Sequence, residues 1–307
     1  MALLARAAED ARLAEREIRR GRFQRSMALI TAFSAIVNGY EAYAQHQRGA
    51  FDQKLMWTPV WLTPPTVAAA GGALASERLA RRLLPAIALV SIVDGIVGFI
   101  YHLKGIARLP GGFRLGQYNI VMGPPIFAPL LSCTVGATGL LAGALRRERA
   151  QPSPEAIEAL QERLGGSDDI TERIAHGRFQ QGMALLAAVF GVLAGGEAYF
   201  EHLRGSFNQR LMWTPVWITP PMVVAGVGAA LSRRIARLVL PLAALVTLLD
   251  GLLGFFLHLR GIKRMPGGFG NLGFNSTLGP PLFAPLLFSA VGMLGLIAAI
   301  LRRDEDS

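Results

Sequence analysis

The sequence predicts an all-α polytopic membrane protein of eight transmembrane helices, arranged as two parallel tandem repeats of four helices each. Apolar residues make up 52% of the 307-residue chain, charged residues only 17%, and the mean hydropathy is +0.38. Soluble domains carry about 25% charged residues, and several apolar segments here approach the roughly 20 residues that cross a bilayer. Residues 21–147 also align without a gap on residues 177–303, with 70 of 127 positions identical.

The elements outside the repeats are polar. Residues 1–20 lack the apolar core of a signal peptide, so we expect a cytoplasmic amphipathic helix there. Between the repeats, residues 148–176 begin a helix at Ser153-Pro154-Glu155 and end it at Gly165-Gly166, which predicts a cytoplasmic connector helix. Residues 304–307 form an acidic tail.

Each repeat has four apolar segments that we interpret as spans. In the first repeat (21–147) they cover residues 26–46, 56–74, 83–103 and 125–145, and in the second (177–303) residues 182–202, 212–231, 239–259 and 281–301. Because four is an even number, both repeats enter and leave the membrane on the same side, which makes them parallel.

The basic residues predict the orientation. With both termini in the cytoplasm, the inner segments hold 21 of the 31 Lys and Arg residues, as expected for cytoplasmic loops. The net charge of +10 is therefore explained by topology and anionic headgroups, and we expect no nucleic-acid partner. The Arg-rich, Ala/Leu/Gly-rich composition is typical of a GC-rich bacterium, which places the protein in the bacterial inner membrane.

Identity between the repeats is concentrated toward the outer side. Residues 41–65 keep 18 of 25 positions, whereas residues 31–40 keep 2 of 10. The outer loop between the third and fourth spans also keeps its PGGF, GPP and FAP motifs, which begin at Pro110, Gly123 and Phe127. We therefore expect the function of each repeat to lie at its outer end.

Two histidines per repeat lie at the outer ends of the first and third spans. They are His46 and His102 in the first repeat and His202 and His258 in the second. Seven residues before each, on nearly the same helix face, lies a glycine: Gly39, Gly95, Gly195 and Gly251. Two facing imidazoles with small residues beneath them are expected of a b-type haem with two histidine ligands. The same glycines also suit close helix packing, and the histidines also suit the headgroup zone.

Each repeat also carries two carboxylates within its spans, Glu41 and Asp94 in the first and Glu197 and Asp250 in the second. Intramembrane charges are functional candidates, and here they can orient an imidazole, handle protons or pair with Arg48 or Lys104. An alternative metal site combines Glu41, His46 and His102 (Glu197, His202 and His258) as nitrogen and oxygen ligands for iron, copper or zinc.

The motif LMWTPVW(L/I)TPP begins at Leu55 and again at Leu211 and contains all four tryptophans. It is typical of an interfacial aromatic belt on a proline-kinked helix, and it can also dock a quinone or a partner. The PGGF loop can act as a lid on the same face, although it lacks the strand and helix of a phosphate-binding loop. With no nucleophile–histidine–acid arrangement, we expect a non-catalytic subunit.

These features favour an integral-membrane redox subunit with one haem b per repeat near the outer, periplasmic face. Because about 30 Å of hydrocarbon separates the two faces, such haems move electrons laterally or between a partner and quinone, within a larger complex. The alternative is a structural or transport subunit without a cofactor.

Overall fold

The computed structural model describes residues 22–144 and 178–300, and every regular element within these two ranges is a helix. The helix expected over residues 1–20, the connector helix of 148–176 and the acidic tail of 304–307 lie outside the described residues. We refer to residues 22–144 as the first half and to residues 178–300 as the second half.

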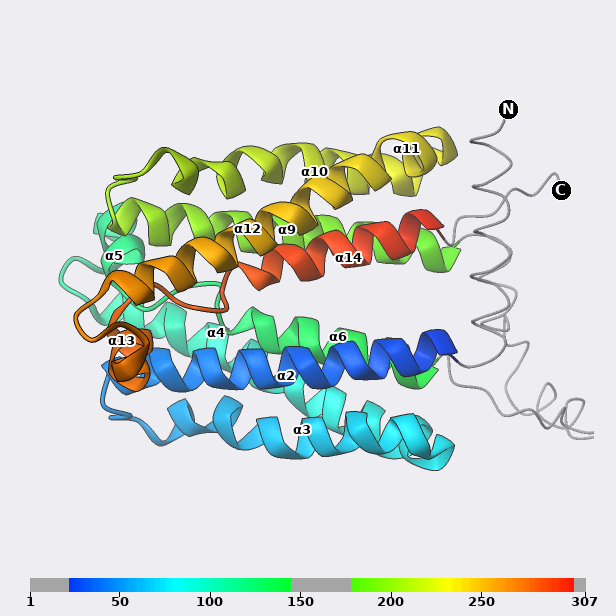
Figure 1. Cartoon of the computed structure of the whole chain (residues 1–307), viewed down its shortest axis with the longest axis horizontal. Helices are drawn as coiled ribbons and strands as arrows, with labels where there is room; N and C mark the ends of the chain where they lie inside the picture. Colours follow the sequence, from blue (N-terminus) through cyan, green and yellow to red (C-terminus); the bar gives the residue numbers. More distant parts are fainter. Residues whose placement is uncertain (1–21, 145–177, 301–307) are drawn as a thin grey trace, which may run out of the picture.

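The first half is a bundle of four long helices (Figure 1): α2 (Arg22–Arg48), α3 (Thr58–Ala75), α4 (Leu84–Arg108) and α6 (Leu130–Ala144). Shorter elements join them: η1 (Lys54–Trp57), the π-helix η2 (Leu79–Leu83), η3 (Gly112–Leu115) and α5 (Gly116–Met122). Both α3 and α6 pack against α2 and against α4, which places α2 and α4 at opposite corners of the bundle.

The second half has the corresponding long helices α9 (Arg178–Arg204), α10 (Thr214–Leu231), α12 (Leu240–Arg264) and α14 (Leu286–Ile300). Its short elements are η4 (Arg210–Trp213), α11 (Arg233–Leu238), η5 (Gly268–Asn271) and α13 (Leu272–Leu278). Here α10 and α14 each pack against both α9 and α12. Every long helix of this half begins 156 residues after its counterpart, which is the offset of the sequence alignment.

Four helices in the described part of the chain are long and apolar enough to cross a membrane: Leu79–Arg108, Gln180–Arg204, Arg210–Leu231 and Leu240–Arg264. Large apolar side chains stay exposed on their outer surfaces, with Val224 at 70% and Leu231 at 84% of full exposure. Monomeric soluble proteins rarely leave so much apolar surface contiguous. The protein is therefore a helical membrane protein whose apolar helices contact lipid.

The last helix of each half is shorter than the expected span. The expected fourth span begins at Pro125, but α6 begins only at Leu130 and α14 only at Leu286. Prolines at 124, 125 and 129 (280, 281 and 285) have no N–H to donate, so the preceding segment stays non-helical. These segments, 123–129 and 279–285, lead into the last helix of each half as irregular chain.

The PGGF motif forms a fixed turn. Gly111 and Gly112 have φ of +78° and +49°, a left-handed conformation that favours glycine. The amide nitrogen of Asn119 donates hydrogen bonds to the carbonyls of Pro110 and Gly112, at 3.0 and 2.7 Å. The second half has the same turn, closed by Asn275. These bonds hold the loop against its own helix.

The two halves lie side by side along their length, with α5 and α13 at the same end of the molecule (Figure 1). That end, which we call the loop end, contains residues 49–57 and 109–129 and their counterparts 205–213 and 265–285. Helix α5 contacts α9, and α13 contacts α2, so each short helix lies against the other half.

Candidate functional site: two histidine pairs at the loop end

The structure brings the two histidines of each half together. His46 lies near the end of α2 and His102 near the end of α4, and their ring centroids are 6.4 Å apart with the planes at 74°. The second-half pair, His202 and His258, has the same centroid distance of 6.4 Å and an angle of 69°. Because α2 and α4 occupy opposite corners of the bundle, these rings meet across its interior.

Backbone carbonyls fix the orientation of the rings. Nδ1 of His102 lies 2.5 Å from the carbonyl oxygen of Pro125, and Nδ1 of His258 lies 2.5 Å from that of Pro281. On the opposite helix, Nδ1 of His202 lies 2.6 Å from the carbonyl oxygen of Met212. His46 has the equivalent neighbour, Met56, although its Nδ1 falls outside hydrogen-bonding geometry.

These contacts determine the useful tautomer. A carbonyl oxygen only accepts hydrogen bonds, so Nδ1 carries the proton in each hydrogen-bonded ring. A neutral imidazole then has its lone pair on Nε2, which is the form that binds a metal, and an Nδ1–H bonded to a carbonyl is a common way to orient such a ligand.

The separation of the rings matches two ligands on opposite sides of one ion. The centre of an imidazole lies about 1.2 Å from its ring nitrogens, and imidazole nitrogens bind metals at about 2.0–2.1 Å. Two rings in trans across one ion therefore have centroids about 6.5 Å apart. The observed centroid separation of 6.4 Å in both halves is close to that value.

Aromatic rings line the first-helix side of each pair. The ring of Phe51 lies 6.0 Å from that of His46 and stacks at 3.9 Å on Trp57, which in turn lies 6.0 Å from Trp61. Phe207 and Trp213 repeat the stack at 3.8 Å beside His202. Trp61 is 67% exposed, so the row leads from the histidine pair to the outer surface of the bundle.

The glycines seven residues before the histidines serve close packing. A Cβ on Gly39 would lie 1.9 Å from the Thr63 hydroxyl, and one on Gly95 would lie 2.7 Å from Sγ of Cys133. In the second half, Gly195 packs against Thr219 and Gly251 against Ser289 in the same way. Protein atoms therefore fill the strips that the glycine spacing predicts for a haem macrocycle, and these glycines do not provide room for one.

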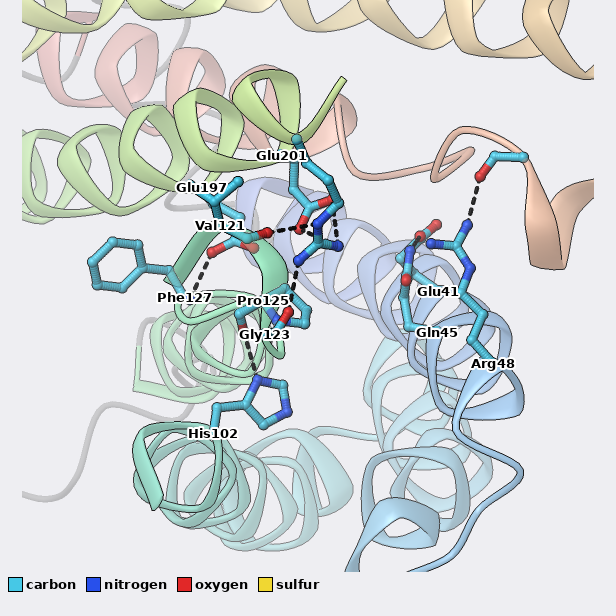
Figure 2. A network of polar contacts seen from close by, with 12 residues as sticks. Glu41, Gln45, Arg48, His102, Val121, Gly123, Pro125, Phe127, Glu197 and Glu201 are labelled. Carbon is cyan, nitrogen blue, oxygen red and sulfur yellow. Dashed lines mark hydrogen bonds and ion pairs between the residues drawn. The ribbon is translucent and has the colours of Figure 1, made fainter. Parts of the chain in front are cut away.

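The two glutamates bind backbone of the other half, and Figure 2 shows the contact of Glu197 with Phe127. Oε2 of Glu41 accepts a hydrogen bond of 3.1 Å from the N–H of Phe283, while Oε1 accepts one of 2.9 Å from Gln45. Oε2 of Glu197 accepts a bond of 2.7 Å from the N–H of Phe127. Within residues 22–144 and 178–300, no three His, Cys, Asp or Glu side chains converge as metal ligands. The carboxylates of Glu41 and Glu197 thus bind loop backbone, and neither joins a histidine pair as a third metal ligand.

Two arginines, each seven residues or about two helical turns beyond one of these glutamates, complete the contact between the halves. Arg204 donates hydrogen bonds of 2.6 Å to the carbonyls of both Val121 and Gly123. Arg48 donates in the same way to the carbonyls of Thr277 and Gly279. We call each set of a glutamate, an arginine and the loop that they hold a cross-half clamp: Glu197 and Arg204 with residues 121–127, and Glu41 and Arg48 with residues 277–283.

The clamps connect each half to the histidine pair of the other. The loop held by Glu197 and Arg204 contains Pro125, whose carbonyl orients His102. The loop held by Glu41 and Arg48 contains Pro281, whose carbonyl orients His258. The first helix of each half therefore supports the third-helix histidine of its neighbour, in a reciprocal arrangement like that of an isologous dimer.

The remaining site candidates lie apart from the histidine pairs. Asp94 is hydrogen-bonded to Thr58, and Asp250 to Thr214. The ammonium of Lys104 lies 5.1 Å from the centre of the Tyr101 ring. Neither aspartate nor Lys104 approaches an imidazole in the described contacts.

No protein-family model, curated protein or solved structure matches the chain, so its function has to be argued from the geometry of the site.

Proposed function

We propose that the chain is an integral-membrane electron-transfer subunit in which each half holds one metal centre between its two histidines. The observation that supports this most strongly is the 6.4 Å centroid separation, present in both halves, with Nδ1 of three of the four rings on a backbone carbonyl. In this proposal eight spans form two parallel four-helix units, and both termini are in the cytoplasm of a bacterial cell.

Charge narrows the choice of metal. Two neutral imidazoles supply no negative charge, so a bare divalent ion would leave two uncompensated charges in a partly buried place, which is costly. Copper(I) leaves one such charge, and ferrous iron in haem b leaves none because the porphyrin carries two negative charges. Imidazole is a suitable ligand for both copper and iron. The proposal is therefore for a copper or haem-iron centre, with zinc disfavoured.

The fit of a haem depends on more than its ligands. The two imidazoles of each half could hold the iron of a haem, but the glycine strips beside them are filled, in the first half by Thr63 and Cys133. The described residues thus support the two-imidazole ligand set without supporting a macrocycle over the glycines, and copper meets the same ligand set with less space. Either metal would supply a one-electron redox couple, and the histidines would hold the metal in place.

The position of the two centres defines the path of electrons. Both pairs lie at the loop end, so neither centre alone spans the roughly 30 Å of hydrocarbon. We therefore propose electron exchange at the outer face, between a periplasmic or membrane partner and quinone. The exposed Trp61, 6.0 Å from Trp57 of the aromatic stack beside His46, and its exposed counterpart Trp217 are the surfaces we assign to that exchange.

The test uses the full-length protein purified in detergent from cells grown with copper and iron. Metal analysis and an absorption spectrum should give two metals per chain, as copper or as b-type haem. His102→Ala and His258→Ala should each remove half of the metal, and the double variant all of it. Less than about one-tenth of a metal per chain, both as purified and after incubation with copper(I) or haemin, would exclude the proposal.

A second function, a cofactor-free structural or transport subunit, is favoured by one observation. The glycine strips and the cross-half clamps join the helices into a tightly packed assembly that needs no cofactor to fill it. In that case the histidines only anchor loops. The same metal analysis would then give nearly zero metal per chain, from a protein that is still folded.

A further inference from the structure

The interiors of the two halves differ in polarity, although their helices correspond. Polar residues of the first-half interior are apolar at the equivalent positions of the second: Asn38 becomes Ala194, Thr66 becomes Met222, Ser132 becomes Phe288 and Thr138 becomes Leu294. Met222 and Phe288 are buried, with 0% and 5% exposure, and fill the second interior with apolar atoms. A polar interior costs free energy in a membrane unless its groups have partners.

A small cavity lies in the polar interior, with room for about one water molecule. Side chains from all four long helices of the first half surround it. The polar ones are Asn38 of α2, Thr63 and Thr66 of α3, Ser91 and Asp94 of α4, and Ser132 of α6.

Three of the hydroxyl groups around this cavity already donate their protons to backbone carbonyls. Thr63 donates to the carbonyl of Pro59 at 3.0 Å, Thr66 to that of Leu62 at 2.7 Å, and Ser91 to that of Ile87 at 3.1 Å. Their oxygens keep free lone pairs, which makes the lining rich in acceptors. The amide N–H₂ of Asn38 donates one of its two hydrogens to the hydroxyl of Ser132 at 3.0 Å. A cation needs only acceptor oxygens, which this lining supplies.

Asp94 adds the one acidic side chain of this lining. It is hydrogen-bonded to Thr58, and in the described ranges no Lys or Arg forms an ion pair with it. An unpaired carboxylate among membrane helices is expensive and marks an ion or proton pathway by default. One carboxylate balances one monovalent cation, whereas a divalent ion would leave a net charge in the interior.

We propose that the first half binds one monovalent cation, such as sodium, between Asp94 and the oxygens of Thr63, Thr66 and Ser91. Hydroxyl, amide and carboxylate oxygens are the ligands of hard cations, and a cavity of one-water size suits sodium. The second half keeps Asp250, Thr219 and Thr247 but fills the space with Met222 and Phe288, so it binds none. The inference does not depend on the histidine pairs.

The test compares the full-length protein in detergent, in sodium chloride and in choline chloride at equal ionic strength. Because a ligand of the folded state raises the unfolding temperature, sodium at about 100 times its Kd should raise Tm by about 5 °C. Equilibrium dialysis with radioactive sodium should give one ion per chain. Asp94→Asn should abolish both effects, and the matched control Asp250→Asn should keep them.

A second variant covers the case in which Asp94→Asn does not fold. Ser132→Phe introduces the side chain that Phe288 has at the equivalent position of the second half. The variant should lose the bound sodium while its Tm in choline is maintained. Equal Tm values in the two salts, or two sodium ions per chain, would overturn the proposal, as would sodium binding that persists in Asp94→Asn.

Discussion

The carboxylate of Glu197 accepts a hydrogen bond from the N–H of Phe127, two residues beyond the carbonyl that orients His102. A residue of the second half thus supports a histidine of the first, 95 positions earlier in the chain. Glu41 does the same for the loop before Phe283 and so for His258. The two metal centres that we propose are therefore coupled to the contact between the halves, and single substitutions should show it.

Removing the Glu197 carboxylate should destabilise the protein and weaken one histidine pair. Glu197→Ala leaves the N–H of Phe127 without an acceptor, which costs about 1–3 kcal/mol when the group is buried. We expect Tm to fall, and the metal bound by the first half to decrease more than that bound by the second. Metal analysis in a His258→Ala background, where only the first pair remains, measures this directly.

Glu197→Gln is the matched control for that prediction, because its amide oxygen still accepts the bond from Phe127. It should keep most of the metal that Glu197→Ala loses. If both variants bind metal like the wild type, the clamp does not support His102.

The arginines of the clamps should not be replaceable by lysine. Arg204 binds two carbonyls with Nε and Nη2, a fork that a lysine ammonium cannot reproduce. Arg204→Lys should therefore lower the free energy of unfolding by about 1–3 kcal/mol. Arg48→Lys, which affects the other clamp, should have a smaller effect because Arg48 is exposed. Thermal unfolding of the two variants side by side checks the order, and a larger loss for Arg48→Lys would contradict it.

Alanine in the glycine strips should be poorly tolerated. A Cβ at Gly95 would lie 2.8 Å from the carbonyl oxygen of Pro129, a backbone atom that cannot turn aside. Gly95→Ala should cost about 1–3 kcal/mol or more by overpacking. In Gly71→Ala the new Cβ meets nothing within 4 Å, and because Gly71 lies inside α3 the change should stabilise that helix by about 0.5–1 kcal/mol. Equal Tm values for the two variants would show that the Gly95 strip is open.

The Asn119 amide should determine whether the PGGF loop is ordered. Asn119 is buried at 2% exposure and donates both of its amide hydrogens to carbonyls of the turn. Asn119→Leu leaves Pro110 and Gly112 without these donors, so residues 110–115 should exchange backbone hydrogens faster than in the wild type. Residues 266–271, closed by Asn275, provide an internal control that should not change.

The sequence alone predicts a helical protein, because its apolar segments have the length of membrane-spanning helices. It also predicts that His46 and His102 lie at similar depth, because each is near the outer end of a helix and the two helices run in the same direction. It did not reveal the clamps, since an alignment of the halves shows which residues are equivalent and says nothing of which touch. The only signal was that Glu41 and Arg48 are both retained as Glu197 and Arg204. The glycines were ambiguous because the same spacing serves a cofactor or a neighbouring helix. Here the neighbours, Thr63 and Cys133, occupy the space.

The ligand environment of the bound metal tests the histidine-pair proposal most directly. X-ray absorption at the metal edge of the purified full-length protein should show two imidazole nitrogens at about 2.0 Å, on copper or on the iron of a haem. His46→Ala and His202→Ala should each halve the amount of imidazole-bound metal per chain. A metal surrounded only by oxygen ligands, or one whose spectrum is unchanged in the double variant His46→Ala/His202→Ala, would contradict the proposal.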